Sequence, residues 1–200
     1  MTVPPQAVID IFTTSEAVSD WQAPGQPPLI RMNGVQWGQL APPDQPSGFQ
    51  VVVLGAYGDL TSPTNILLNT YVYLQGDDGQ WGSTYQWMYA QVINAVLNAG
   101  NYEAQILLLV SFGLDLDMPP SNDALQFLLE RGAGPGLQQW ETTSEPGSQE
   151  GGWIGLPASY ILVGNLGYGY AQGTEAFASN GGEPAPADVS VTFTNNIPPT

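Results

Sequence analysis

Asp115 and Asp117 are acids whose spacing could do chemistry, because they stand two residues apart between an apolar run and a helix start. On an extended strand, residues at this spacing point to the same side, so the two carboxylates could hold a hard cation such as Ca²⁺. The alternative is a turn in which both acids are solvated near the N-terminus of the next helix, where negative charge is stabilised. The sequence favours the turn and keeps Ca²⁺ as the alternative. No other cofactor is expected.

The chain lacks the side chains that most catalytic sites use. Its 200 residues include 18 Asp and Glu but no His and no Cys, and its two cations are Arg31 and Arg131. The usual general base, thiolate chemistry and lysine chemistry are therefore excluded. A glycosidase needs two opposed carboxylates, and no spacing singles out such a pair. We expect a protein that is not an enzyme, and an acid-only glycan hydrolase is the remaining enzymatic alternative.

Aromatic residues offer a second kind of site, because tyrosine and tryptophan rings stack on sugars while amide and carboxylate groups bind hydroxyl groups. Tyr168 and Tyr170 follow an apolar run in the segment GNLGYGY, so a loop could present both rings. With Trp153 and Trp81 they form the predicted glycan-binding set. The alternative is that these rings lie in the core or in a subunit interface, where aromatic residues are also enriched.

The charge balance limits the partners of the chain. Its formal net charge is −16, yet only 10% of its residues are charged, against about 25% in a typical soluble domain. Binding of nucleic acid or of anionic membrane surfaces is not expected, because few cations are available. The first residues, MTVPPQAVIDIFTT, lack the features of a signal peptide, and no apolar run is long enough to span a membrane. We expect synthesis in the cytoplasm and a location on the surface of a virion.

The hydrophobic pattern predicts an α+β fold with a two-layer core over residues 49–177. Its mixed or antiparallel sheet is expected to contain the runs FQVVVLGAYG, ILLNTYVYLQ, QILLLVSF, LQQW and SYILVGNLGYGY. Two helices are expected. The first runs from Thr84 to Gly100. The second covers SNDALQFLLERGAG, begins at Ser121 or Asn122, and ends at Arg131 and Gly132.

Proline-rich stretches flank this core and predict an N-terminal arm over residues 1–48 and a C-terminal arm over residues 178–200. The N-terminal arm has a further short strand candidate at Leu29–Trp37. Alternating segments in both arms could add to the sheet edge of a neighbouring subunit. The residues expected to do so are Val8, Ile9, Ile11, Phe12, Val189, Val191 and Phe193. The alternative is that the arms are simple tethers.

Four segments of the chain carry a resemblance to a known family: GFQVVVL (48–54), QILLLVSFGLDLD (105–117), SNDALQFLLERGAG (121–134) and YILVGNLGYGYAQGTEAF (160–177). The order and spacing of these segments, over roughly residues 48–177, resemble those of the interleukin-like EMT inducer (ILEI/PANDER) domain. This domain occurs in secreted cytokine-like proteins, glycosyltransferase stem modules and phage tail-associated proteins. The resemblance implies a non-enzymatic binding or scaffolding module, in some members for carbohydrate. The chain departs from the family in lacking disulfides, in a longer stretch before the first helix, and in its arms.

These observations together predict a non-enzymatic virion structural protein of a tailed phage. It would be a capsid decoration protein or a tail-fibre or adaptor component, homo-oligomeric and in contact with other virion proteins through its arms and sheet edges. The alternative function is that of a carbohydrate-binding module that recognises host surface glycans.

Overall fold

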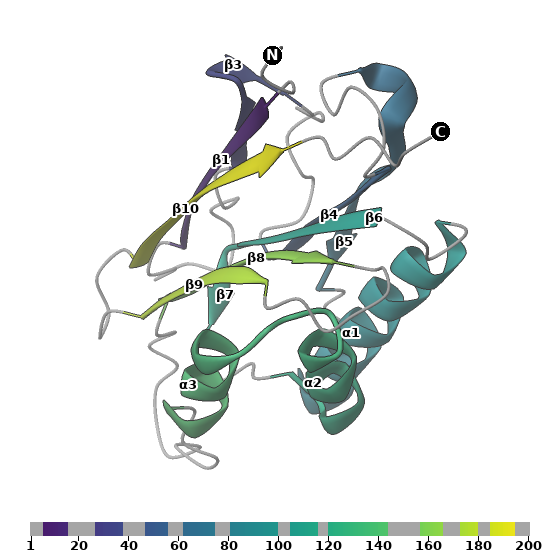
Figure 1. The fold of residues 1–200 in the computed structure, drawn as a ribbon. Helices are drawn as coiled ribbons and strands as arrows, with labels where there is room; N and C mark the ends of the chain where they lie inside the picture. Colours follow the sequence, from purple (N-terminus) through teal and green to yellow (C-terminus); the bar gives the residue numbers. More distant parts are fainter. Residues whose placement is uncertain are drawn as a thin grey trace.

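A computed structural model describes residues 6–15, 27–37, 47–55, 62–74, 81–99, 105–115, 120–143, 157–165, 173–179 and 185–194. In these ranges the chain forms two β-sheets, three α-helices and a short 3-10 helix at Pro63–Asn65 (Figure 1). Every strand pairing between described residues is antiparallel. The prediction of an α+β fold is confirmed, and the sheets are antiparallel rather than mixed.

The larger sheet contains most of the strands that the apolar runs predict. Its order is β5–β4–β6–β8, and β8 also pairs with β9 and with the short β7. Its strands are β4 (Gly48–Gly55), β5 (Ile66–Tyr73), β6 (Gln105–Phe112), β7 (Leu114–Asp115), β8 (Pro157–Asn165) and β9 (Thr174–Ser179).

The smaller sheet joins the two ends of the chain in the order β10–β1–β2–β3. Its strands are β1 (Gln6–Ser15), β2 (Leu29–Met32), β3 (Val35–Gln36) and β10 (Ala185–Thr194). The central pairing aligns Ile11 with Val189 and with Ile30.

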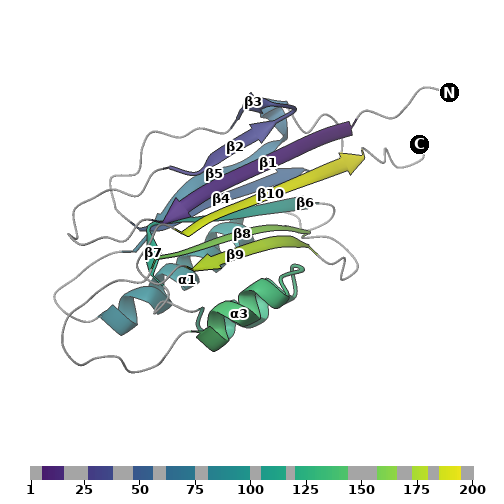
Figure 2. The same ribbon diagram turned by 90° about the vertical axis from the view of Figure 1, so that its left-hand side faces the viewer.

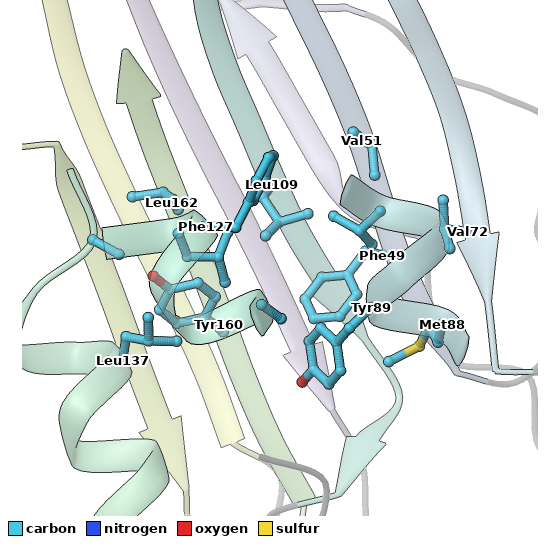
Figure 3. Packing of buried hydrophobic residues seen from close by; sticks show 14 of the residues in the cluster. Phe49, Val51, Val72, Met88, Tyr89, Leu109, Phe127, Leu137, Tyr160 and Leu162 are labelled. Carbon is cyan, nitrogen blue, oxygen red and sulfur yellow. The ribbon is translucent and has the colours of Figure 1, made fainter. Parts of the chain in front are cut away.

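The described elements form three layers rather than the predicted two (Figure 2). The larger sheet lies in the middle. The smaller sheet covers one of its faces, and α1 (Trp81–Asn98), α2 (Asn122–Leu129) and α3 (Pro135–Thr143) cover the other. Figure 3 shows side chains such as Phe49, Tyr89 and Tyr160 in the space between this sheet and the helices.

Burial on both faces explains the uninterrupted apolar runs of the central strands. In β4, Val51 and Val53 pack toward the helices while Val52 packs toward the smaller sheet. In β6, Leu109 and Leu108 divide in the same way. A strand that was covered on one side only would alternate apolar and polar residues, so the uninterrupted runs fit cover on both faces, which the predicted two-layer core does not provide.

The predicted arms differ most from the structure. Described residues of both arms form the smaller sheet instead of extending from the core. The reason is the alternation of the two segments, which buries one face of each strand: Ile9, Ile11 and Val189 lie in the core between the sheets. Covering the exposed face of β4, β6 and β8 within the same chain stabilises the fold more than leaving two apolar faces in solvent.

Three local predictions also need correction. LQQW is not a strand, because Leu137 and Trp140 lie in α3, which begins with proline at a position that favours helix starts. Strand β9 was not predicted. The single strand expected at Leu29–Trp37 is a hairpin, since Asn33 and Gly34 have φ values of 50° and 78° and turn the chain between β2 and β3.

The sequence predicts the start of a helix well where the capping residue gives a strong local signal. The predicted cap of α2 is confirmed: the Ala124 N–H donates to Ser121 Oγ at 3.4 Å. The first helix begins at Trp81, three residues before the predicted Thr84.

Candidate functional site

The residues predicted to bind glycan or cation fall largely outside the described part of the chain. Trp153, Tyr168, Tyr170 and Asp117 lie outside the described residues. Trp81 begins α1 and Asp115 ends β7, but their side chains are not among those described. The glycan set and the Ca²⁺ alternative therefore stay predictions.

The arm residues are described, and those of β1 do not suit the predicted role, whereas Val189, Val191 and Phe193 lie in β10, an edge strand of the smaller sheet. Strand β1 pairs with β10 on one side and β2 on the other, so it has no open edge to add to a neighbour's sheet. Ile9, Ile11 and Val189 are buried. Val8, Val191 and Phe193 are half-buried, and Phe12 is 44% exposed on the outer side of the smaller sheet. Ile9, Ile11 and Val189 belong to the core between the sheets, and Val191 and Phe193 pack against it.

Glu175 on β9 forms the most densely bonded carboxylate among the described residues. Its Oε1 accepts N–H hydrogen bonds from Gly134 at 3.0 Å and Gly136 at 2.6 Å, and its Oε2 accepts one from Leu137 at 3.3 Å. The Tyr160 hydroxyl donates to Oε2 at 2.9 Å. Because these N–H groups begin α3, the carboxylate caps the helix and complements its dipole from a distant strand.

This carboxylate–phenol pair serves the fold. Tyr160 is fully buried, and burial together with the negative charge of Glu175 raises the pKa of its hydroxyl well above the ordinary value. Figure 3 shows the Tyr160 ring beside Leu137 of α3. The Tyr160 phenol keeps its proton, and the Glu175 carboxylate accepts four hydrogen bonds, so the pair fastens α3 to the sheet.

Buried hydroxyl groups likewise connect the layers. Ser15 at the end of β1 donates from its backbone N–H to Ser159 Oγ at 2.9 Å and from its hydroxyl to the Ala158 carbonyl at 2.6 Å. Thr13 Oγ1 donates to the Ser111 carbonyl at 2.5 Å. These bonds join the smaller sheet to β6 and β8, and satisfy polar groups that would be costly to bury unpaired.

The edges of the two sheets differ in how well they are protected. Edges in natural proteins are blunted by charges, proline, short length or covering elements. Strand β10 carries Pro186 and Asp188, and β3 has only two residues. Strand β9 carries Glu175 and lies against α3 and β10. Each of these three edges therefore has a recognisable protection.

Strand β5 is the exception. Its eight residues, ILLNTYVY, contain no charge and no proline, and among the described residues it pairs only with β4. A bulge against Val53 and Leu54 leaves Leu67 out of register, and this side chain is 44% exposed. The six following residues pair regularly. No described strand pairs with the outer side of β5, and a long, uncharged edge strand is a template for another strand.

One face of β5 also presents aromatic and amide groups together. The half-buried Tyr71 and Tyr73 rings have centroids 5.9 Å apart, and Tyr71 packs edge-on against Phe112 at 5.3 Å. Beside them, Gln50 Nε2 donates to Asn69 Oδ1 at 2.9 Å. The sequence does not distinguish these tyrosines from buried ones, because alternation along a strand does not reveal which rings the neighbouring layer leaves partly exposed.

No known protein-family model and no curated protein matches the chain. The resemblance to the ILEI domain therefore stays a prediction. Within the described ranges, no three acidic side chains gather where they could hold a metal ion, and no helix is long and apolar enough to cross a membrane.

Proposed function

We propose that the chain is a non-enzymatic structural protein of a tailed-phage virion, acting as a capsid decoration protein or a tail-fibre or adaptor component. The observation that carries the proposal is the edge of β5, which is long, uncharged and paired on one side only among the described residues. Such an edge favours association with another strand. The assembly function moves from the predicted arms to this edge.

Two further features support a structural role. The Glu175–Tyr160 pair caps α3, and the buried hydroxyls of Ser15 and Ser159 bind backbone groups and each other. Their hydrogen-bonding capacity is used to hold the layers together. The proposal includes other virion proteins as partners and does not involve nucleic acid, a membrane or a cofactor.

Incorporation into particles tests this role. Leu67→Lys places a charge on the β5 edge, where lysine is a natural blocker of strand addition. Val35→Lys is the matched control, because Val35 is an exposed apolar residue, 70% accessible, on the short edge strand β3. Phage particles encoding each variant would be purified and the chain quantified by mass spectrometry.

We expect the unaltered chain and Val35→Lys in purified particles at constant copy number, and Leu67→Lys reduced by about tenfold, equivalent to about 1.4 kcal/mol of lost interaction. The role in the virion is wrong if the unaltered chain is found in the lysate but not in particles. Equal incorporation of both variants would remove β5 as the assembly edge.

A second candidate function is the binding of a neutral glycan. It is favoured by Tyr71 and Tyr73, two half-buried rings on one face of β5, beside the amides of Gln50 and Asn69. Aromatic faces and amide groups are the common elements of sugar sites.

A glycan array with Tyr73→Ala and Trp87→Ala tests this candidate. Trp87 is 41% exposed on α1 and serves as the matched control for loss of a surface ring. We expect Tyr73→Ala to lower binding of a retained glycan by about tenfold or more, in line with about 1–3 kcal/mol for a stacked ring. An equal loss in Trp87→Ala, or no bound glycan, would refute this function.

A further inference from the structure

We propose that β5 pairs with β5 of a second copy of the chain, in antiparallel register about a two-fold axis that passes through Thr70. The inference rests on the assembly role proposed above and names the partner at that edge. The pairing would join the larger sheets of two copies into one continuous sheet.

Two-fold geometry restricts the register. In a continuous antiparallel sheet, two paired residues face the same side of the sheet. A residue of one β5 can therefore pair only with a residue of the other β5 whose number differs from its own by an even amount or by zero. Leu68 and Val72 face the helices, while Tyr71 packs against Phe112 on the opposite side. The axis must therefore pass beside one residue that pairs with its own copy.

Among the regularly paired residues of β5, Thr70 gives complementary neighbours. Thr70 meets Thr70 of the second copy, a favourable cross-strand pair. Leu68 then faces Val72 on the helix side, and Asn69 faces Tyr71 on the other. Tyr73 of one copy reaches the exposed Leu67 of the other. If the axis instead passed beside Tyr71, this tyrosine would pair with its own copy. The two rings would then meet where each already contacts Tyr73 and Phe112 of its own chain.

A second copy is favoured as the occupant because one closed pairing covers, in both chains at once, the edge with which no other described strand pairs. The edge itself has no charge, so it is a place where two chains of net charge −16 can meet without opposed carboxylates. Because two identical acidic chains repel each other, their association should strengthen as added salt screens their charges. A basic partner would show the opposite dependence.

The absence of cysteine from the sequence allows a direct test. In Thr70→Cys the two thiols would face each other across the axis, with Cβ atoms about 4.5–5.5 Å apart before adjustment, close to what a disulfide requires. Thr192→Cys is the matched control, because Thr192 is an exposed threonine in β10 of the smaller sheet. Both purified proteins would be oxidised mildly and followed by non-reducing electrophoresis at roughly 0.02 and 0.5 M NaCl.

We expect Thr70→Cys to form covalent dimers at least about tenfold faster than Thr192→Cys, because pairing raises the local thiol concentration, and we expect the rate to increase with salt. Equal rates would overturn the inference. The apparent masses of Leu67→Lys and Val35→Lys provide a second readout if Thr70→Cys does not fold. A monomer for the first and a dimer for the second support the pairing, whereas the same mass for both contradicts it.

The outcomes separate this inference from the proposed function. Loss of Leu67→Lys from particles without Thr70→Cys cross-linking means that β5 binds another virion protein, so the role stands and the self-pairing fails. Cross-linking of a chain that is not present in particles means that the pairing stands and the virion role fails.

Discussion

At the scale of single residues, Glu175 and Tyr160 show how a potentially reactive pair can be structural. The carboxylate receives three backbone N–H bonds and one phenol bond. Gly136 permits this approach, since a Cβ there would lie 3.1 Å from the carboxyl carbon. Replacing Tyr160 by phenylalanine would remove one donor and leave the other three.

Tyr160 also gives a prediction for alkaline pH. Its folded-state pKa is raised well above the ordinary 10.0, by burial and then by Glu175. As pH rises above about 10, the unfolded chain loses this proton while the folded chain keeps it, so the free energy of unfolding decreases. Stability from this group is complete below pH 10 and is lost as pH approaches the folded-state pKa.

Urea unfolding of Tyr160→Phe between about pH 8 and 11 checks this prediction. At neutral pH the variant should lose about 1–3 kcal/mol, because a hydrogen bond to a charged group is removed. Above about pH 10 its stability should fall less steeply than that of the unaltered chain. Tyr71→Phe is the comparison: burial also raises the pKa of the half-buried Tyr71, though less than that of Tyr160, so this variant should reduce the alkaline loss by less than Tyr160→Phe. The assignment fails if Tyr160→Phe keeps the full alkaline loss.

At the scale of elements, the strands β1 and β10 decide whether the chain ends are arms or part of the core. Adjacent residues of β1 face opposite sides, so Ile9 is fully buried between the sheets while Val8 is half-buried on the outer side. Strand β1 therefore supplies both a buried residue to mutate, Ile9, and a matched control, Val8.

Ile9→Ala should lower the free energy of unfolding by about 2–5 kcal/mol, as expected for a buried isoleucine that leaves a cavity. Val8→Ala should cost less than about 1 kcal/mol, because the residue is only partly covered. Chemical unfolding of both variants at equal protein concentration provides the measurement. Equal, small effects would mean that residues 6–15 behave as an arm in solution.

At the scale of the whole molecule, charge and topology act together. A chain with net charge −16 and two arginines cannot build a surface of ion pairs, and Arg131–Glu130 is the ion pair among described residues. A net charge of this size makes copies of the chain repel one another overall. The uncharged strand β5 offers one place where two copies can meet without opposed carboxylates.

The sequence by itself determined the chemistry that the chain lacks and the segments that form its central strands. Side-chain types are independent of the fold, so the absence of His, Cys and Lys excludes whole reaction classes directly. The runs at Val51–Leu54 and Ile106–Val110 predict buried strands because periodicity is local. The cap of α2 was predictable for the same reason, since Ser121 lies three residues from the N–H that it binds.

Only the tertiary structure decided the features that depend on distant residues. Helix α3 is capped by Glu175, 38 to 41 residues away, so no local window could separate LQQW in a helix from LQQW in a strand. The alternation of the chain ends predicts strands but not which sheet they cover. Whether β5 is a central or an edge strand depends on the strands that lie beside it, and the proposed assembly site rests on that position.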